Sequence, residues 1–402
     1  MSFLYRKHDL FSTIKNVIVR FLKSDIHAYN KSKKNTSNSV YECAILNYYH
    51  KLQCLEEKLE TADKIRANAH KTLIKKSAEK IDLLKKTICT KESDLLIVGP
   101  AATGLTISKD FDVFVVFVLP NDESNDFLKN LKKMKCKHIE KTGKLIKANK
   151  KLWNEKKDKL SHNFNASIPK TKLNFGDGTR ITIKFSCHNS LKNTNLIRYY
   201  TASDPRYRKV YMYIKNLASK LKIIDANNGL LSGYQILVLV AHFLQRSLKD
   251  QQPVFPVIPQ VCSSFVSPNL PLKEVVKNLK EPVDVSGIQC LINSKPLASH
   301  LAIQFIDYFA NFDFLSKAIF LDKIDPVEML QVDSPPKLQI FDPYSDESIS
   351  KGYCASEAFS ESMKYVQNLI KEGYCIDDFS NLPGLDDFKK KFSKSSHMQS
   401  KS

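Results

Sequence analysis

The feature that most constrains this chain lies around residue 100, where two apolar runs flank a short turn. The first run, Leu95–Val98, ends at Gly99, and the second, Asp112–Leu119, is β-branched and aromatic. Runs of this composition bounded by Gly or Pro are typical of buried strands. Asp110 and Asp112 stand at the start of the second run, and alternation along a strand puts both carboxylates on one face. The sequence therefore predicts a strand–turn–strand unit with paired acids at a strand end.

Paired carboxylates beside a turn of small residues have a definite chemistry. Carboxylate oxygens are ligands that Mg²⁺ prefers, and the backbone N–H groups of such a turn can meet phosphate oxygens. Together they suit nucleotidyl transfer from a triphosphate, in which two metal ions hold the attacking and leaving oxygens. Taken alone, however, two acids after a glycine turn are more often a solvated strand edge, so the rest of the chain must decide.

The net charge indicates a class of binding partner, and the cysteines indicate a cellular compartment. The 402 residues include 62 Lys and Arg against 42 Asp and Glu, a formal net charge of +20. This excess favours a polyanionic partner, nucleic acid first and an anionic membrane surface second, whereas a lysine-rich surface that only aids solubility is the alternative. The longest apolar stretch, Ile236–Leu244, is too short to span a bilayer, so we expect no membrane insertion. Nine scattered cysteines without a CxxC pair predict reduced thiols in an intracellular protein, in the cytoplasm or the nucleus.

The N-terminal part of the chain is predicted to be helical. Residues 3–22 carry an apolar stripe at helical spacing with basic residues on the other face, which predicts a helix docked on the main body. An organelle presequence or a membrane-surface helix is the alternative, so mitochondrial import stays open. Residues 27–40 are typical of a polar linker, and residues 41–88, which lack Gly and Pro, predict one or two helices.

The pattern beyond residue 170 changes from strands to helices. A Gly176–Gly178 turn between two extended runs predicts a hairpin over Lys172–Ser186. Helical periods dominate after about residue 200, and the Lys/Ser-rich tail after Lys389 is predicted to be disordered. The predicted fold class is α+β, with an α/β module near 88–200 and a helical module over 200–385 that includes the N-terminal helices.

Several segments match one known family in order. Gly99–Val113 resembles the signature of the polymerase-beta-like nucleotidyltransferases, a glycine turn ending in G-L, then S-D-x-D and a hydrophobic strand. More closely, the chain resembles the non-canonical poly(A) and poly(U) polymerases, the RNA terminal nucleotidyltransferases, in the segments Ile168–Leu173, Leu191–Arg206, Gly229–Tyr234, Phe243–Pro259, Phe305–Phe314 and Ile340–Tyr344. Each segment is weak by itself, but the ordered set spans about residues 90–380.

The resemblance implies an architecture, partners and a cofactor. It implies a small mixed-sheet nucleotidyltransferase palm domain plus a helical PAP-associated domain. The bounds it suggests are 1–88 for N-terminal helices packing on the helical domain, 89–200 for the palm with a basic insertion at 121–165, 201–388 for the helical nucleotide-recognition domain and 389–402 for the tail. The implied partners are an RNA 3′ end and a nucleoside triphosphate, and the implied cofactor is Mg²⁺ or Mn²⁺.

The lysine-crowded segment 129–172 and the two predicted modules carry two further expectations. The segment is predicted to lie outside and contact RNA phosphates, or else to be a solvated helical insertion. Asp110 and Tyr234 are predicted to share one cleft between a small mixed sheet and the helical module.

The resemblance also implies roles for individual residues. Asn193 and Thr194 contact the ribose hydroxyls, and Tyr234 stacks under the base, where a core aromatic is the alternative. Lys215 neutralises triphosphate charge, unless it is an exposed helix lysine, and Ser232 adds a phosphate hydrogen bond. The full nucleotide-binding set is Gly99, Pro100, Asn193, Thr194, Lys215, Ser219, Ser232, Tyr234 and Asp342.

The family's catalytic acids are incomplete in this sequence. Asp110 and Asp112 match the two metal ligands, but the third carboxylate, 11 positions before Asn193, is replaced by Thr182. A threonine cannot take the proton of the RNA 3′-hydroxyl, and losing a general base costs roughly 10²–10⁴-fold. Asp177 is close in sequence but lies in the predicted turn, and five residues of strand span ~17 Å.

Other positions of the family pattern differ as well. Pro100 replaces the turn serine and Lys109 the serine before the first acid. Ser219 stands where a second lysine is common, and the residues after Asp342 lack the histidine that uridylyl members often carry. Either the chemistry has been rearranged or the site is degenerate.

These observations leave alternatives from different classes. One is an enzyme that adds UMP or AMP to RNA 3′ ends without a template by a two-metal mechanism. Another is a catalytically degenerate relative that binds RNA and nucleotide or holds an active protein partner. A membrane-surface protein that uses the basic N-terminal helix is a third.

Overall fold

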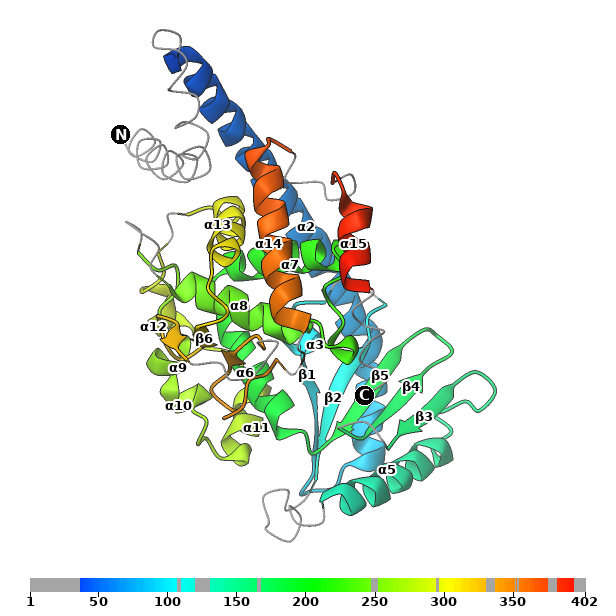
Figure 1. The fold of residues 1–402 in the computed structure, drawn as a ribbon. Helices are drawn as coiled ribbons and strands as arrows, with labels where there is room; N and C mark the ends of the chain where they lie inside the picture. The colour runs from blue at the N-terminus through cyan, green and yellow to red at the C-terminus, as the bar shows by residue number, and fades with distance from the viewer. Residues whose placement is uncertain are drawn as a thin grey trace. The chain divides into compact units, whose positions relative to one another are not determined.

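The computed structural model describes residues 37–106, 110–119, 131–164, 168–246, 252–293, 296–329, 337–350, 352, 354–374 and 382–393. Their contacts divide the chain into two compact units, each discontinuous in sequence. Unit 1 comprises Met1–Thr61, Arg206–Val257 and Leu291–Ser402, and unit 2 comprises Ala62–Pro205 and Ile258–Cys290. Both mix helices and strands (Figure 1), as the α+β class predicts. The domain bounds predicted from the sequence are continuous blocks and stay predictions.

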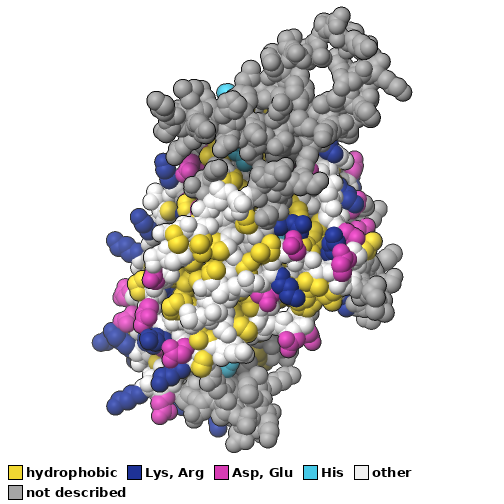
Figure 2. All heavy atoms as spheres, turned by 90° about the vertical axis from the view of Figure 1, so that its left-hand side faces the viewer, with side chains coloured by type: hydrophobic (Ala, Val, Ile, Leu, Met, Phe, Trp, Pro, Cys, Tyr) yellow, Lys and Arg dark blue, Asp and Glu magenta, His cyan; other side chains and the backbone are white. Residues whose placement is uncertain are grey.

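Side chains of both charges are visible on the surface. On the face drawn in Figure 2, lysines and arginines stand next to aspartates and glutamates rather than in one basic patch. No described helix is long and apolar enough to cross a membrane. The predicted helix over residues 3–22 lies outside the described residues.

Unit 2 is built on a mixed sheet of five strands. Their order is β1-β2-β5-β4-β3, with β2 and β5 parallel and the other neighbours antiparallel. The strands are β1 Asp94–Val98, β2 Val113–Val118, β3 Lys159–Asn163, β4 Lys170–Asn174 and β5 Arg180–Phe185. The expected strands at residues 95–98 and 112–119 and the expected hairpin are therefore confirmed as β1, β2 and β4–β5. Strand β3 was not predicted, because its sequence KLSHN has no β-branched residue.

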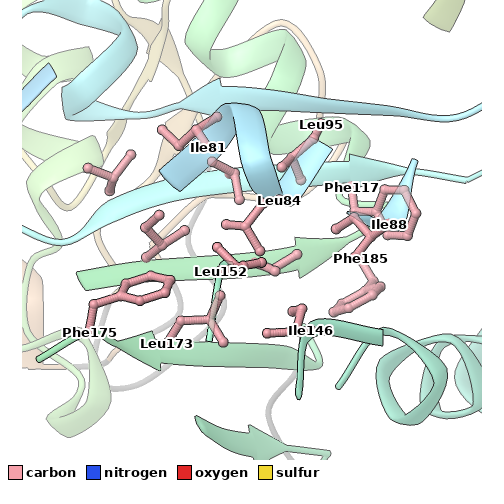
Figure 3. Close-up of a cluster of buried hydrophobic side chains, with 14 of the residues drawn as sticks. Ile81, Leu84, Ile88, Leu95, Phe117, Ile146, Leu152, Leu173, Phe175 and Phe185 are labelled. Atoms are coloured by element: carbon pink, nitrogen blue, oxygen red, sulfur yellow. The ribbon is translucent and has the colours of Figure 1, made fainter. Parts of the chain in front are cut away.

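One face of the sheet packs on two helices. Helix α2 (Ser37–Ile88), a single helix over the region where one or two were expected, and helix α5 (Leu131–Ala148) cover it. Figure 3 shows side chains of α2, α5 and the strands in this core, among them Ile81, Leu84, Ile88, Leu95, Phe117, Ile146, Leu173 and Phe185. The lysine-crowded segment thus places Ile146 and Trp153 in the core, whereas Lys141, Lys144 and Lys150 are exposed.

The opposite face of β1 and β2 is covered by helices. There, helices α6 (His188–Ser203) and α11 (Leu272–Lys280) pack on the strands. The segment 258–290, which also contains α9 (Ile258–Val261), α10 (Ser263–Val266) and α12 (Ser286–Gln289), is held to helix α6 by hydrogen bonds. Asn195 donates to the carbonyl of Phe265 at 2.8 Å, and Arg198 donates to the carbonyl of Asn278 at 2.9 Å.

Unit 1 is mainly helical, as expected beyond residue 200. Its elements include α7 (Pro205–Lys220), η1 (Ala226–Asn228), α8 (Gly233–Gln245), α13 (Ala298–Ala310), α14 (Cys354–Lys371) and α15 (Leu385–Ser393). Fully buried aromatic side chains fill its core, namely Phe243, Phe305, Phe309 and Phe359. A small sheet, β6 (Lys317–Phe320), β7 (Val327–Glu328) and β8 (Ile340–Phe341), was not predicted because strands of two to four residues leave no periodic pattern. Helix α15 also runs into the predicted disordered tail.

Candidate functional site

The two acids before β2 are engaged by an arginine. Asp110 is exposed, and the Asp112 side chain is 34% exposed. Arg180 opens the neighbouring parallel strand β5, whose register pairs Ile181 with Val113. Arg180 Nε lies 2.6 Å from Asp112 Oδ1, and Arg180 Nη2 donates to the backbone carbonyl of Asp110. A guanidinium therefore occupies the side of Asp112 that a cation would take.

Thr182 follows two residues after Arg180 on β5. Because its neighbours Ile181 and Ile183 point into the core, Thr182 points to the opposite face of the sheet. It pairs with Phe114 across the parallel ladder and is only 2% exposed. Thr182 therefore shares a sheet face with Arg180, and alternation puts Asp112 on that face too.

These residues do not fit a two-metal site. Among the described residues there is no group of three or more His, Cys, Asp or Glu side chains that could hold a metal ion. Asp112 is already neutralised by Arg180, and the Thr182 hydroxyl is a poor ligand and no base at neutral pH. This site thus has two carboxylates, Asp110 and Asp112, and Asp112 is paired with Arg180. The two-metal site that the family resemblance implies has three carboxylates.

Asp177, the nearest further acid in the sequence, is committed elsewhere. Its Oδ1 accepts a hydrogen bond from the Thr179 backbone at 2.8 Å, and its Oδ2 lies 4.0 Å from Lys80 Nζ on α2, which covers the other face. Although burial acts to raise the pKa of Asp177, the Thr179 hydrogen bonds and the charges of Lys80 and Lys76 leave it below the ordinary value. Asp177 is therefore a weak base and faces away from Thr182.

The Gly99 turn is tied to helix α6. Gly99 has a φ of +65°, which favours glycine, and its N–H donates to Thr194 Oγ1 at 2.9 Å. Thr194 in turn donates to the Ser190 carbonyl, so its hydroxyl is used inside the protein. Pro100 begins the short helix α3 (Pro100–Thr103), where a missing N–H does not disturb the helix. Asn193 Oδ1 is buried and accepts no hydrogen bond from any described residue.

Lys215 of unit 1 is a half-buried cation. Its Nζ lies 5.5 Å from the centre of the Tyr211 ring, and burial lowers its pKa. No described carboxylate forms an ion pair with Lys215, so its positive charge is available to a bound anion. Ser219, one turn later on α7, is exposed.

Ser232 begins helix α8 as its N-cap. Its Oγ accepts from Gln235 N at 3.2 Å, and the Gln235 side chain accepts from Ser232 N at 2.6 Å, which completes a capping box. Because the Ser232 oxygen acts as an acceptor here, its own O–H can still donate.

Tyr234 is held by a buried carboxylate. Its hydroxyl donates to Asp342 Oδ2 at 3.0 Å, and the Tyr344 backbone donates to Asp342 Oδ1 at 2.9 Å. Asp342 is 7% exposed and directly follows β8. Burial and the Asp342 charge raise the pKa of Tyr234 well above its ordinary value, so the phenol stays a neutral donor. Asp342 thus fixes the orientation of the Tyr234 ring.

The predicted residues fall into two sets. Unit 2 holds Gly99, Pro100, Asp110, Asp112, Thr182, Asn193 and Thr194, and unit 1 holds Lys215, Ser219, Ser232, Tyr234 and Asp342. The common cleft of Asp110 and Tyr234 stays a prediction, as do the individual roles. Sequence reasoning missed Arg180, although its position two residues before Thr182 already put it on the same strand face.

Comparisons with known proteins point to one group of relatives. No family model matches the chain. The chain is 29% identical over 179 residues to the poly(A) RNA polymerase gld-2 of Caenorhabditis elegans, a match of 43% of this chain and 16% of that protein. It is 31% identical over 130 residues to poly(A) RNA polymerase GLD2 of Bos taurus, a match of 32% of this chain and 25% of that protein. The matched region therefore spans a quarter or less of these relatives' length.

Solved structures show the same fold. The structure of a GLD-2/RNP-8 complex superimposes with a TM-score of 0.60 at 21% identity and covers 84% of this chain and 98% of that chain. The Cid1 poly(U) polymerase with MgGTP bound gives a TM-score of 0.57 at 18% identity, with 83% and 98% covered. The chain has the fold of these nucleotidyltransferases.

Proposed function

We propose that this chain is an RNA terminal nucleotidyltransferase homologue that binds a nucleoside triphosphate and an RNA 3′ end, but turns them over weakly. The observation that carries the proposal is the ion pair of Arg180 with Asp112 beside Thr182, where the family's reaction needs a third carboxylate. The Asn193 amide oxygen without a described hydrogen-bond partner, the Lys215 ammonium without an ion pair and the Tyr234 ring fixed by Asp342 support retained nucleotide binding. The relatives' names support RNA as the other ligand.

An active enzyme that adds UMP or AMP is the second candidate. The retained Asp110 and Asp112 favour it, because an arginine at the surface can give way to a bound metal–nucleotide complex. A protein partner that restores activity is an extension of the first proposal.

Extension of a 3′ end separates the two candidates. Purified protein is incubated with a labelled RNA, each of the four nucleoside triphosphates in turn, and Mg²⁺ or Mn²⁺, while nucleotide binding is measured in parallel by calorimetry. We expect nucleotide binding with little or no extension. Rapid extension with any one triphosphate contradicts the proposal, and absence of both binding and extension contradicts both candidates.

A further inference from the structure

The outer half of the sheet in unit 2 has a polar face that carries many cations. The ladders of β3, β4 and β5 align three rows of side chains on the face opposite the core. These rows are Lys159, Asn174 and Arg180; Ser161, Lys172 and Thr182; and Asn163, Lys170 and Lys184. Five of the nine residues are Lys or Arg, and none is Asp or Glu. We call these nine residues the cationic sheet face.

Two of these lysines lie directly opposite each other. Lys170 pairs with Lys184 in the antiparallel ladder of β4 and β5, and like charges directly opposite each other destabilise a sheet. Burial, and then the charge of Lys170, lower the pKa of Lys184. The Lys184 ammonium lies 5.2 Å from the Phe114 ring centre. This crowding does not stabilise the fold, and a bound anion would relieve it.

The chain itself does little to neutralise the face. Within the described part of the chain, Lys159, Lys170 and Lys172 form no ion pair, and the acid at the edge, Asp112, is taken by Arg180. This differs from the surface in Figure 2, where acidic and basic side chains are mixed. Where the family places a metal-binding carboxylate, at Thr182, this chain has a neutral residue flanked by cations along and across the strands.

We infer that the cationic sheet face binds the phosphate groups of an RNA strand directly, without a divalent metal. The inference rests on the proposed function and names its RNA-binding surface. Strands lie about 4.8 Å apart and alternate residues about 7 Å apart, so the cations spread over roughly 10 Å by 13 Å. That area suits successive phosphates of a chain better than one triphosphate. Lysine and arginine that neutralise phosphates release counterions, which makes such binding dependent on salt rather than on metal.

Fluorescence anisotropy with a short 5′-labelled oligouridylate tests the inference. The test variant is Lys170→Glu with Lys172→Glu, on β4. The matched control is Lys141→Glu with Lys144→Glu, two exposed positions on α5, the helix that covers the opposite face. Both pairs change the charge equally and come from the same lysine-crowded segment. Each protein is titrated with Mg²⁺ and with EDTA at equal ionic strength.

The expected result distinguishes the two surfaces. Wild-type affinity should be the same in Mg²⁺ and EDTA, the β4 pair should lose about tenfold or more, and its salt slope should fall by about 1.4, which is 0.7 for each lost phosphate contact on a single strand. The α5 pair should lose much less. A Lys170→Gln, Lys172→Gln pair with unchanged thermal unfolding should show a smaller loss of the same kind, which excludes misfolding as the cause.

Four results would overturn the inference. Loss of RNA binding in EDTA would show that binding requires a divalent metal. Equal losses of affinity in the β4 and α5 double variants would show that the charge effect is non-specific. Displacement of the RNA by ATP that depends on Lys170 and Lys172 would make the face a triphosphate site. A wild-type protein that binds ATP but no RNA fails this inference while leaving nucleotide binding by the proposed function intact.

Discussion

Two carboxylates of the predicted site, Asp112 in unit 2 and Asp342 in unit 1, are both paired inside the chain, but in opposite ways. Asp112 is 34% exposed and faces an arginine that is 49% exposed. Asp342 is 7% exposed and accepts hydrogen bonds from the neutral groups of Tyr234 and Tyr344. The first pair is a surface ion pair worth at most about 1 kcal/mol, whereas buried acceptors are costly to leave unpaired.

The difference teaches where the molecule tolerates change. Side chains that orient a ring are built into the core of unit 1, so altering them would cost stability. Side chains that handle charge at the edge of the sheet lie at the surface, where an arginine or a threonine replaces the expected residue at little cost. We therefore expect the orientation of the Tyr234 ring to depend on buried groups of unit 1 and the charge balance to be adjustable in unit 2.

The largest expected effect is acid destabilisation of unit 1. His242 on α8 and His300 on α13 are buried, which lowers their pKa values to about 3 and about 4. In the unfolded chain a histidine has a pKa of about 6.5, so below this pH the unfolded chain binds a proton at each histidine and the folded chain does not. The free energy of unfolding therefore falls as the pH falls, and at pH 5 each histidine lowers it by about 2 kcal/mol. Hydrogen exchange should show α8 and α13 losing protection at pH 5 before the strands of unit 2.

A histidine variant serves as the control for this expectation. His242→Gln should reduce the dependence of stability on pH by about half, because one of the two histidines that gain a proton on unfolding is gone. Equal loss of protection in both units would show that the buried histidines do not limit acid stability.

Removal of Asp342 is expected to have the next largest effect. Asp342→Ala leaves Tyr234 Oη and the Tyr344 N–H without their acceptor and should lower the free energy of unfolding by about 1–3 kcal/mol. Nucleotide affinity should fall with it, because the Tyr234 ring loses its orientation. Urea unfolding and calorimetry measure the two effects. Asp346→Ala, at an exposed position four residues later, is the matched control, and an equal loss there would remove the distinction.

Restoring the third acid is expected to act on turnover alone. Thr182→Asp should raise RNA extension tenfold or more, since a general base contributes about 10²–10⁴-fold. Adding Arg180→Gln should raise it further, because Asp112 then loses the arginine that pairs with it. Asp110→Ala should abolish whatever extension exists. Rapid wild-type extension with a neutral Thr182→Asp would favour the active-enzyme hypothesis.

The smallest effect is expected from breaking the surface ion pair. Arg180→Gln should change the free energy of unfolding by less than about 1 kcal/mol, because an exposed pair is screened by water. Thermal unfolding at low and high salt measures the change. A decrease of several kcal/mol in the free energy of unfolding would mean that the contacts of Asp112 stabilise the fold as much as those of Asp342.

Much of the sheet could be predicted, and the ion pair could not. The runs at Leu95–Val98 and Asp112–Leu119 are apolar enough to identify β1 and β2, and the Gly176–Gly178 turn identifies the hairpin. The face of Thr182 also followed from alternation along the strand. Which strand lies beside β2 is a long-range property that no local pattern encodes, so the approach of Arg180 to Asp112 emerged only with the parallel register.

The segments of the two units alternate along the chain, so the two units are completed at different times during synthesis. Unit 2 receives its last segment, 258–290, only after Arg206–Val257 of unit 1 has been made. Until then, the face of β1 and β2 that later meets Leu272 and Val275 lacks those partners, and Arg198 lacks the carbonyl of Asn278. At roughly 5–20 residues per second, the gap lasts for several seconds on the ribosome. During this interval the nascent sheet exposes an apolar surface, and a fragment that ends near Pro205 would keep it exposed permanently.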